Sequence, residues 1–163
     1  LRVGIPKEYR VEGMPAETRR RAAELLAMGK VVAVFPAGGV ATANKPLTGR
    51  AVDAPWHPFV GRLATIPGVT TLPVHFAGQN SRLFQIASHT SYPLRVALIF
   101  HETRRRMGRK VDLRIGAPIA ASDLAHLGRD QVASHLRRRC MALAAPALKD
   151  IDETYIWPSH IKW

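Results

Sequence analysis

The chain reads Val-Val-Ala-Val-Phe-Pro-Ala-Gly-Gly from Val31 to Gly39, and this stretch predicts both a strand and a site. Its first five residues are apolar and mostly β-branched, which is typical of a strand buried on both faces in a parallel sheet. Pro36 ends the strand because it has no N–H for the ladder, and the glycines allow a close backbone approach or a positive φ. Ligands of open α/β sheets bind beyond the carboxyl ends of the strands. We therefore expect a site here, with a simple turn as the alternative.

The length and composition favour one globular domain. With 163 residues, 47% of them hydrophobic, the chain is long enough to bury an adequate core. No apolar run approaches the roughly 20 residues of a membrane-spanning helix, and the first residues carry no signal-peptide pattern. Because the chain does not open with methionine, we expect it to be part of a longer protein. Cys140 is the single cysteine and no Cys/His set has zinc spacing, so we expect no internal disulfide, no metal and a cytoplasmic setting.

The charge points to an anionic partner. Lys and Arg number 24 against 12 Asp and Glu, which gives a formal net charge of +12. Such an excess favours nucleic acid, anionic lipid or phosphorylated substrates. The basic residues cluster at 19–21, 104–110 and 137–139. Each cluster taken alone also fits a solvated helix face.

Helical patterns alternate with apolar extended segments along the chain. We expect helices at 15–29, 59–66, 80–88 and 122–144, the last interrupted near Gly128, and a helix or an extended segment at 94–106. We expect strands at 31–35, 69–76 and 110–116, the second made irregular by Pro73. The alternation predicts an α/β fold with a central, mostly parallel β-sheet flanked by helices. Residues 1–149 would belong to this domain and residues 150–163 would form an aromatic C-terminal tail.

Four blocks of sequence share their order and spacing with one known family. They are 31–38, 49–53 with Trp56 soon after, 72–76 with 78–81 following, and 111–119. In this order they resemble the lysophospholipid and glycerolphosphate acyltransferases, most of all their haemolysin-like bacterial branch. The resemblance implies that residues 1–149 are the C-terminal portion of an acyltransferase-like α/β domain, whose N-terminal part would precede Leu1.

The resemblance also implies a chemistry. These enzymes transfer a fatty acyl group from a coenzyme A or carrier-protein thioester to a hydroxyl of a lysophospholipid or glycerolphosphate-type acceptor, as in phospholipid biosynthesis. In the family, a histidine followed after four residues by an aspartate acts as general base on that hydroxyl. Basic residues and backbone N–H groups would hold the acceptor phosphate. The implied partners are the acyl-thioester co-substrate and an anionic membrane surface or phospholipid, with the protein cytoplasmic and peripheral on the membrane and no bound cofactor.

The chain departs from the family pattern at the reacting groups. None of its seven histidines has an aspartate five positions later, so we assign no catalytic residue and expect that block before Leu1. Where the family has Phe-Pro-Glu-Gly-Thr, Ala37 replaces the glutamate and Gly39 the threonine. Arg50 or Asp53 would then supply the polar groups that meet the acceptor. The predicted substrate-binding residues are Phe35, Pro36, Ala37, Gly38, Gly39, Arg50 and Asp53.

Other conspicuous residues have structural interpretations. We expect His57 to anchor its loop, His75 to be a hydrogen-bonded core histidine and Ser81 to cap the following helix. Cys140 fits a structural position on a helix face. The aromatic tail fits equally a bilayer interface or docking, either onto the protein's own sheet or onto a missing segment.

A basic, non-catalytic module that binds anionic lipid or nucleic acid is the alternative function. Nucleic acid is the less favoured ligand, because the chain has no aromatic-rich RNP block, no zinc spacing and no suitable Gly-x-x-Gly clamp. The turn at Gly38 and Gly39 lacks the glycine spacings of dinucleotide and Walker sites. The acyltransferase interpretation is therefore favoured.

Overall fold

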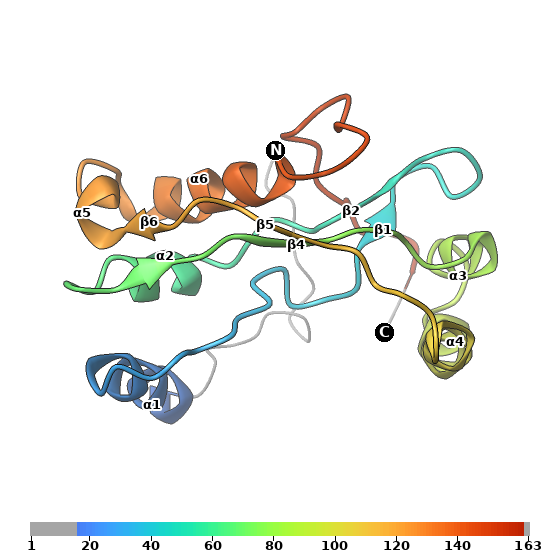
Figure 1. The fold of residues 1–163 in the computed structure, drawn as a ribbon. Coiled ribbons are helices and arrows are strands. Elements are labelled where there is room, and N and C mark those ends of the chain that lie inside the picture. The colour runs from blue at the N-terminus through green and yellow to red at the C-terminus, as the bar shows by residue number, and fades with distance from the viewer. Residues whose placement is uncertain (1–15, 162–163) are drawn as a thin grey trace.

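The computed structural model describes residues 16–161, in which helices surround short strands (Figure 1). The helices are α1 (Ala16–Ala27), α2 (Phe59–Ala64), α3 (Arg82–Ala87), α4 (Tyr92–Arg106), α5 (Ala121–Leu124) and α6 (Arg129–Met141). The strands are β1 (Thr42–Ala43), β2 (Ala51–Val52), β3 (Thr70–Thr71), β4 (Val74–Phe76), β5 (Leu113–Ile115) and β6 (Ile119–Ala120).

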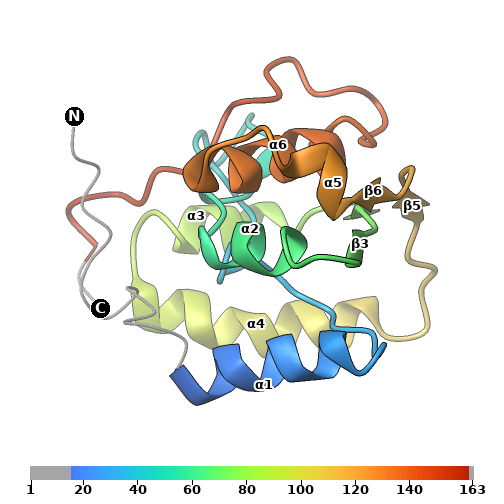
Figure 2. The same cartoon turned by 90° about the vertical axis from the view of Figure 1, so that its left-hand side faces the viewer.

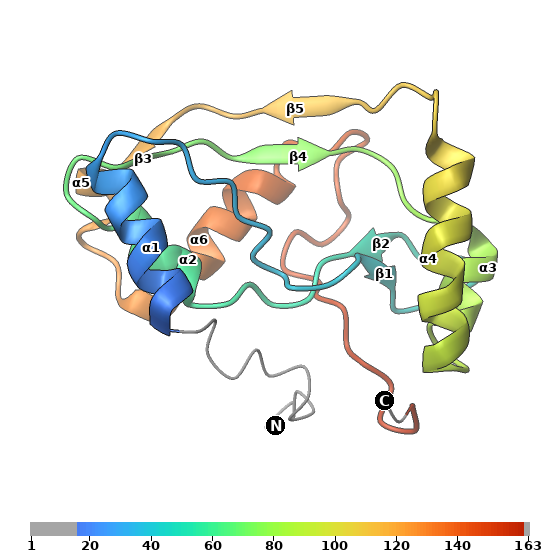
Figure 3. The same cartoon turned by 90° about the horizontal axis from the view of Figure 1, so that it is seen from below.

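The expected α/β fold with a central, mostly parallel sheet is wrong. Within the described residues the strands form three separate two-stranded sheets, β1–β2, β3–β6 and β4–β5, and each pair is antiparallel. The α3–α4 hairpin lies at one end of the strands, so the chain leaves β4 and re-enters β5 at that same end (Figure 3). A parallel pair needs a crossover that returns the chain to the opposite end. The segment at 113–120 must therefore run back along the segment at 70–76.

These two segments form one long, irregular ribbon. His75 lies opposite Arg114 in the β4–β5 register, and Thr70 lies opposite Ala120 in the β3–β6 register. Pro73 separates β3 from β4, as its missing N–H predicts, while its carbonyl accepts from the N–H of Gly116 at 2.9 Å. The expected irregularity at Pro73 is confirmed.

Residues 31–35 form an extended segment that has no strand partner among the described residues. Val32 and Val34 pack against the α1–α2 contact, whereas Val31 is 96% and Phe35 78% exposed. This alternation is the period of extended backbone. The apolar run predicted a strand buried on both faces, but the segment buries one face only, because helices rather than a strand provide its partner.

Helix α2 lies between α1 and α6 and contributes to both hydrophobic clusters (Figure 2). The cluster towards α5, α6 and β6 contains Ala64, Ile119, Leu124, Val132 and Leu136. The cluster towards α1 contains Ala22, Phe59 and Leu63. Each fully buried Leu, Ile, Val or Phe side chain contributes about 1.5–3 kcal/mol, so α2 is the centre of the packing.

Most of the expected helices are confirmed, with small changes at their ends. The segment at 94–106 belongs to a helix, α4, and the expected helix at 122–144 divides at Gly128 into α5 and α6. Gly29, with a φ of 71°, follows the end of α1, while the proposed start of that helix at Pro15 lies outside the described residues. Ser81 caps α3 as predicted, because its side chain accepts from the N–H of Phe84.

Helix α4 has an inverted pattern of polarity. Arg95 and Glu102 are only 5% and 4% exposed, whereas Phe100 on the outer side is 80% exposed. Arg95, Glu102 and Arg106 are spaced seven and four residues apart, which places them on one face of the helix. Each is hydrogen-bonded to a different segment of the chain. The buried side of α4 therefore holds the fold through polar contacts.

Arg95 has the most contacts of this kind. Its guanidinium donates to the hydroxyls of Thr42 and Ser88, at 2.9 and 2.6 Å, and to the carbonyl of Val40 at 3.0 Å. It also lies 5.1 Å from the ring centroid of Trp157. A buried charge is tolerated only when it is paired and hydrogen-bonded, so this arginine ties the 40–42 loop, α3 and the C-terminal tail to α4.

The described part of the C-terminal tail docks onto the protein itself. Asn44 donates to the carbonyl of Thr154 and accepts from the N–H of Ile156, both at 2.9 Å. Tyr155 and Ile161 are buried. Of the two alternatives for the aromatic tail, residues 150–161 therefore fit docking onto the fold.

We expect Arg95→Met to lower the free energy of unfolding by about 3 kcal/mol, because it leaves several polar partners of a buried charge without a donor. Urea unfolding followed by circular dichroism measures this loss. Arg104→Met, at an exposed position of the same helix, is the control and should change stability by less than about 0.5 kcal/mol. Equal effects of the two variants would contradict the assigned role of Arg95.

Candidate functional site

A cleft of about 960 Å³ lies between the segment that follows α1 and the segment that contains β3 and β4. Residues 29–37 line one side and residues 68–80 the other, and residues 50–53 also contribute. Helices α2 and α6 supply Leu63, Ala64, Leu136 and Cys140. The two lining segments are coloured blue after α1 and green before α3 in Figure 1.

Most of the wall surface is apolar. Phe35 and Phe76 face each other with their ring centroids 6.4 Å apart. Val31, Leu72 and Phe76 join Phe35 among the exposed large hydrophobic residues that line the cleft. A concentration of exposed apolar side chains in one hollow is typical of a binding site for an apolar group.

The polar residues of the cleft are held by hydrogen bonds from neighbouring segments. Gln79 accepts from the N–H of Ala51 at 2.9 Å, which joins the loop after β4 to β2. Asp53 accepts from the indole N–H of Trp56 at 3.0 Å. Arg50 donates to the carbonyl of Pro146 at 2.6 Å, so one of its N–H groups is already engaged. These contacts place an arginine, a carboxylate and an amide on the same cleft.

The predicted substrate-binding residues meet at this cleft. It is lined by Phe35, Pro36, Ala37, Gly39, Arg50 and Asp53. Gly38 does not line it, but its φ of 66° forms the turn, and its N–H donates to the carbonyl of Phe35 at 3.2 Å. His57 anchors the turn, because its N–H donates to the carbonyl of Pro36 at 2.9 Å and its ring nitrogen accepts from the N–H of Phe59. The expected anchoring role of His57 is confirmed.

Sequence reasoning missed three residues that line the cleft, His75, Gln79 and Arg106. His75 was expected to be a core histidine, but it is only half-buried. Arg106 donates to the carbonyl of Gln79, and a side chain at Gly78, whose φ is 103°, would come within 3.2 Å of that guanidinium. In the sequence, the signal for this close approach was a glycine between an apolar strand and a polar loop.

Burial shifts two titratable groups beside the cleft. The pKa of His75 lies below its ordinary value because the ring is partly withdrawn from water; Arg50 adds to this effect and Asp53 opposes it. Burial raises the pKa of the Cys140 thiol to about 11, and its Sγ lies 3.2 Å from the carbonyl oxygen of Val74. At neutral pH the thiol is therefore protonated, which agrees with the structural position expected for it.

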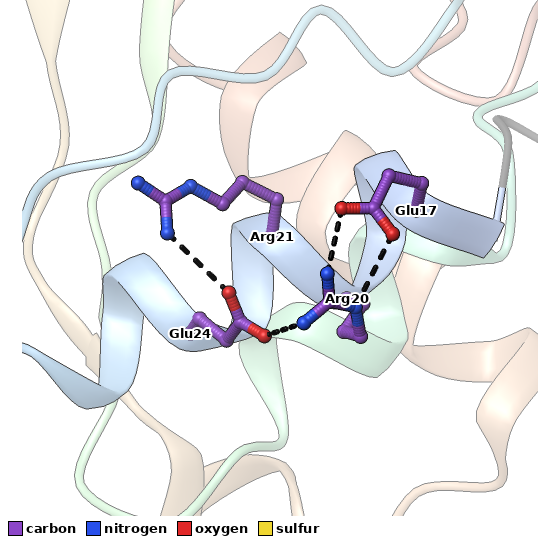
Figure 4. Close-up of polar contacts among 4 residues, drawn as sticks. All are labelled: Glu17, Arg20, Arg21 and Glu24. Carbon is purple, nitrogen blue, oxygen red and sulfur yellow. Dashed lines mark hydrogen bonds and ion pairs between the residues drawn. The ribbon is translucent and has the colours of Figure 1, made fainter.

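The first basic cluster is an ion-paired helix surface. Arg20 pairs with Glu17 at 2.7 Å and with Glu24, and Arg21 lies 3.4 Å from Glu24 (Figure 4). The partners are three or four residues apart, as on the side of a helix, and all are partly or fully exposed. The solvated helix face is the correct interpretation here.

The third basic cluster holds the tail. Arg137 is buried and donates to the carbonyls of Ile151, at 2.9 Å, and Glu153. Arg138 pairs with Asp152 at 2.6 Å. Arg137 and Arg138 thus have partners within the chain.

No protein-family model, curated protein sequence or solved structure matches this chain. Among the His, Cys, Asp and Glu side chains that the structure describes, no three are grouped so that they could hold a metal ion. Nor does any helix in the described part of the chain have the length and apolar character needed to cross a membrane.

We expect the NMR titration of His75 to have a midpoint below 6.5, the ordinary value for histidine. Arg50→Gln should raise this midpoint because it removes a nearby positive charge, and Asp53→Asn should lower it further. Since the unfolded chain binds the proton more readily than the folded chain, the contribution of His75 to stability is lost as the pH falls through about 6.5. A wild-type midpoint at or above 6.5 would contradict the placement of the ring.

Proposed function

We propose that this chain carries the lipid-substrate site of an acyltransferase. The reaction would transfer a fatty acyl group from a coenzyme A or carrier-protein thioester to the hydroxyl of a lysophospholipid or glycerolphosphate-type acceptor. One observation carries the proposal: all four sequence blocks that resemble this family contribute to a single cleft. Phe35–Ala37, Arg50–Asp53, Val74–Phe76 and Val111 are distant in the sequence, yet all of them line it.

The size and lining of the cleft support an acyl chain as the ligand. Protein sites for small molecules usually enclose roughly 300–1,000 Å³ and are mostly apolar, and a cleft of about 960 Å³ falls within this range. Burial of each CH₂ group contributes about 0.8 kcal/mol. The exposed side chains of Phe35, Leu72 and Phe76 line the cleft and would pack against such a chain in place of water.

The polar residues of the cleft support an anionic or ester-bearing end on that ligand. Arg50 donates one hydrogen bond to Pro146, and no other partner of its guanidinium lies among the described residues. The forked donors of arginine match phosphate and carboxylate oxygens. Gln79 and Asp53 add hydrogen-bonding groups nearby.

The proposal assigns substrate binding to these residues and leaves proton transfer unassigned. In the reaction, the acceptor oxygen bonds to the thioester carbonyl carbon, the C–S bond breaks, and the hydroxyl proton ends on the released thiol. The general base of the family is a histidine with an aspartate at the fifth position after it, and no histidine of this chain has one. A net charge of +12 supports a cytoplasmic protein that works at an anionic membrane surface.

We expect Phe35→Ser to weaken the binding of monomeric lysophosphatidic acid at least tenfold, because it removes an aromatic wall of the cleft. Isothermal titration calorimetry below the critical micelle concentration measures the affinity. Phe100→Ser is the matched control: this residue is 80% exposed against 78% for Phe35, but it lies on α4 and does not line the cleft. The affinity of Phe100→Ser for lysophosphatidic acid should stay within twofold of the wild type.

The alternative function gives a different result. A basic module that only binds anionic surfaces would bind anionic vesicles or nucleic acid without using the cleft. Phe35→Ser would then leave the affinity for lysophosphatidic acid unchanged. Equal affinities of the wild type, Phe35→Ser and Phe100→Ser for lysophosphatidic acid would reject the acyltransferase proposal.

A further inference from the structure

A small polar pocket lies at the C-terminal end of α4. It encloses about 200 Å³ and is lined by Gln79, Arg105, Arg106, Arg109 and Lys110. Four of these five residues are cationic. A water molecule occupies about 30 Å³ in the liquid, so the pocket has room for a hydrated phosphate group.

The turn after α4 brings the four cations together. Helix α4 ends at Arg106, and Gly108 follows with a φ of 73°, a left-handed conformation that favours glycine. The N–H of Arg109 donates to the carbonyl of Arg106 at 3.1 Å. Arg109 and Lys110 are therefore folded back beside Arg105 and Arg106 instead of leaving along the helix axis.

The positive charge of this pocket is not balanced within the described part of the chain. Glu102 lies 3.8 Å from Arg105, but this buried carboxylate also accepts from the N–H and the hydroxyl of Ser81. No other carboxylate among the side chains that the structure describes pairs with the lining cations. The clusters on α1 and α6 differ, since Arg20 and Arg21 on α1 (Figure 4) and Arg138 on α6 have carboxylate partners.

Complementing the helix dipole accounts for only part of the cluster. Cations in the last turn of a helix are stabilised by its carbonyl groups, which explains Arg105 and Arg106. Arg109 and Lys110 lie beyond that turn, where the dipole falls off. Their convergence leaves an excess of positive charge that an anion would stabilise.

The polar pocket adjoins the apolar cleft. Gln79 and Arg106 line both of them, and the carbonyl of Gln79 accepts from Arg106 at the boundary. A ligand that combines an acyl chain with a phosphate could therefore occupy the two hollows together. Arg50 differs from these residues, since it lines the cleft alone and already donates a hydrogen bond to the carbonyl of Pro146.

We propose that the pocket at the end of α4 binds the phosphate monoester of the substrate whose acyl chain occupies the cleft. This inference rests on the proposed function. Arginine forks bind phosphate oxygens in pairs, and a lysine ammonium adds a point charge. The same chemistry suits the phosphate of a lipid head group or of a soluble phosphate ester, and the two sources differ in whether a chain fills the cleft.

The test uses the full 163-residue chain with glycerol 3-phosphate and with monomeric lysophosphatidic acid, which share a head group and differ in the acyl chain. Calorimetry compares the wild type with Arg109→Gln/Lys110→Gln. The matched control is Arg20→Gln/Arg21→Gln on α1, which removes the same charge from a distant surface. Unchanged thermal unfolding verifies that both double variants are folded.

We expect Arg109→Gln/Lys110→Gln to lower the affinity for both ligands at least tenfold, while the affinities of the α1 control stay within twofold of the wild type. Tighter binding of lysophosphatidic acid than of glycerol 3-phosphate by the wild type would identify the lipid as the source of the phosphate. Equal affinities for the two ligands would identify a soluble phosphate ester and would refute the link between the pocket and an acyl chain in the cleft.

The outcomes separate this inference from the proposed function. If Arg109→Gln/Lys110→Gln changes neither affinity while Phe35→Ser still weakens lysophosphatidic acid, the phosphate pocket is refuted and the proposed function stands. If Arg109→Gln/Lys110→Gln weakens the binding of glycerol 3-phosphate while Phe35→Ser leaves the affinity for lysophosphatidic acid unchanged, the phosphate pocket is supported and the proposed lipid site is refuted. Equal losses of affinity in both double variants would show that the ligands are attracted by the overall positive charge, which would refute a specific phosphate site in the pocket.

Discussion

The buried polar face of α4 is the constraint on which the rest of the structure depends. Arg95 holds the loop before β1, Glu102 holds the start of α3 through Ser81, and Arg106 holds the loop at Gln79. A buried charge that loses its partners costs several kcal/mol, so each of these segments has one favourable position relative to the helix. Two of these segments, at 40–41 and 78–80, line the cleft, and the end of α4 itself forms the cationic pocket.

The open cleft follows from the way the segment at 31–35 is packed. Val32 and Val34 are fixed on α1 and α2, which holds the segment away from the β3–β4 edge and leaves Phe35 exposed beside Phe76. Apolar surface in contact with water is unfavourable, at roughly 25 cal/mol for each Å². An apolar ligand that covers both walls would recover this free energy, and we propose that its charged end binds in the cationic pocket next to Gln79.

The sequence predicted local structure better than it predicted the sheet. Helix periodicity, the Ser81 cap and the break at Gly128 all concern neighbours along the chain, and they were right. The parallel sheet was wrong because strand direction depends on where the α3–α4 hairpin returns the chain, which no local pattern encodes. Phe35 and Arg50 were placed together from sequence blocks, whereas the pocket at Arg109 depends on a turn that only the three-dimensional structure shows.

The central claim is that an acyl chain lies between residues 31–37 and residues 69–76. A lysophosphatidic acid with a photoreactive diazirine on its acyl chain tests this most directly, with the labelled peptides identified by mass spectrometry. The account predicts labels on both segments, and their loss when unlabelled lysophosphatidic acid competes. Labels confined to the outer face of α4, around Phe100, would contradict it.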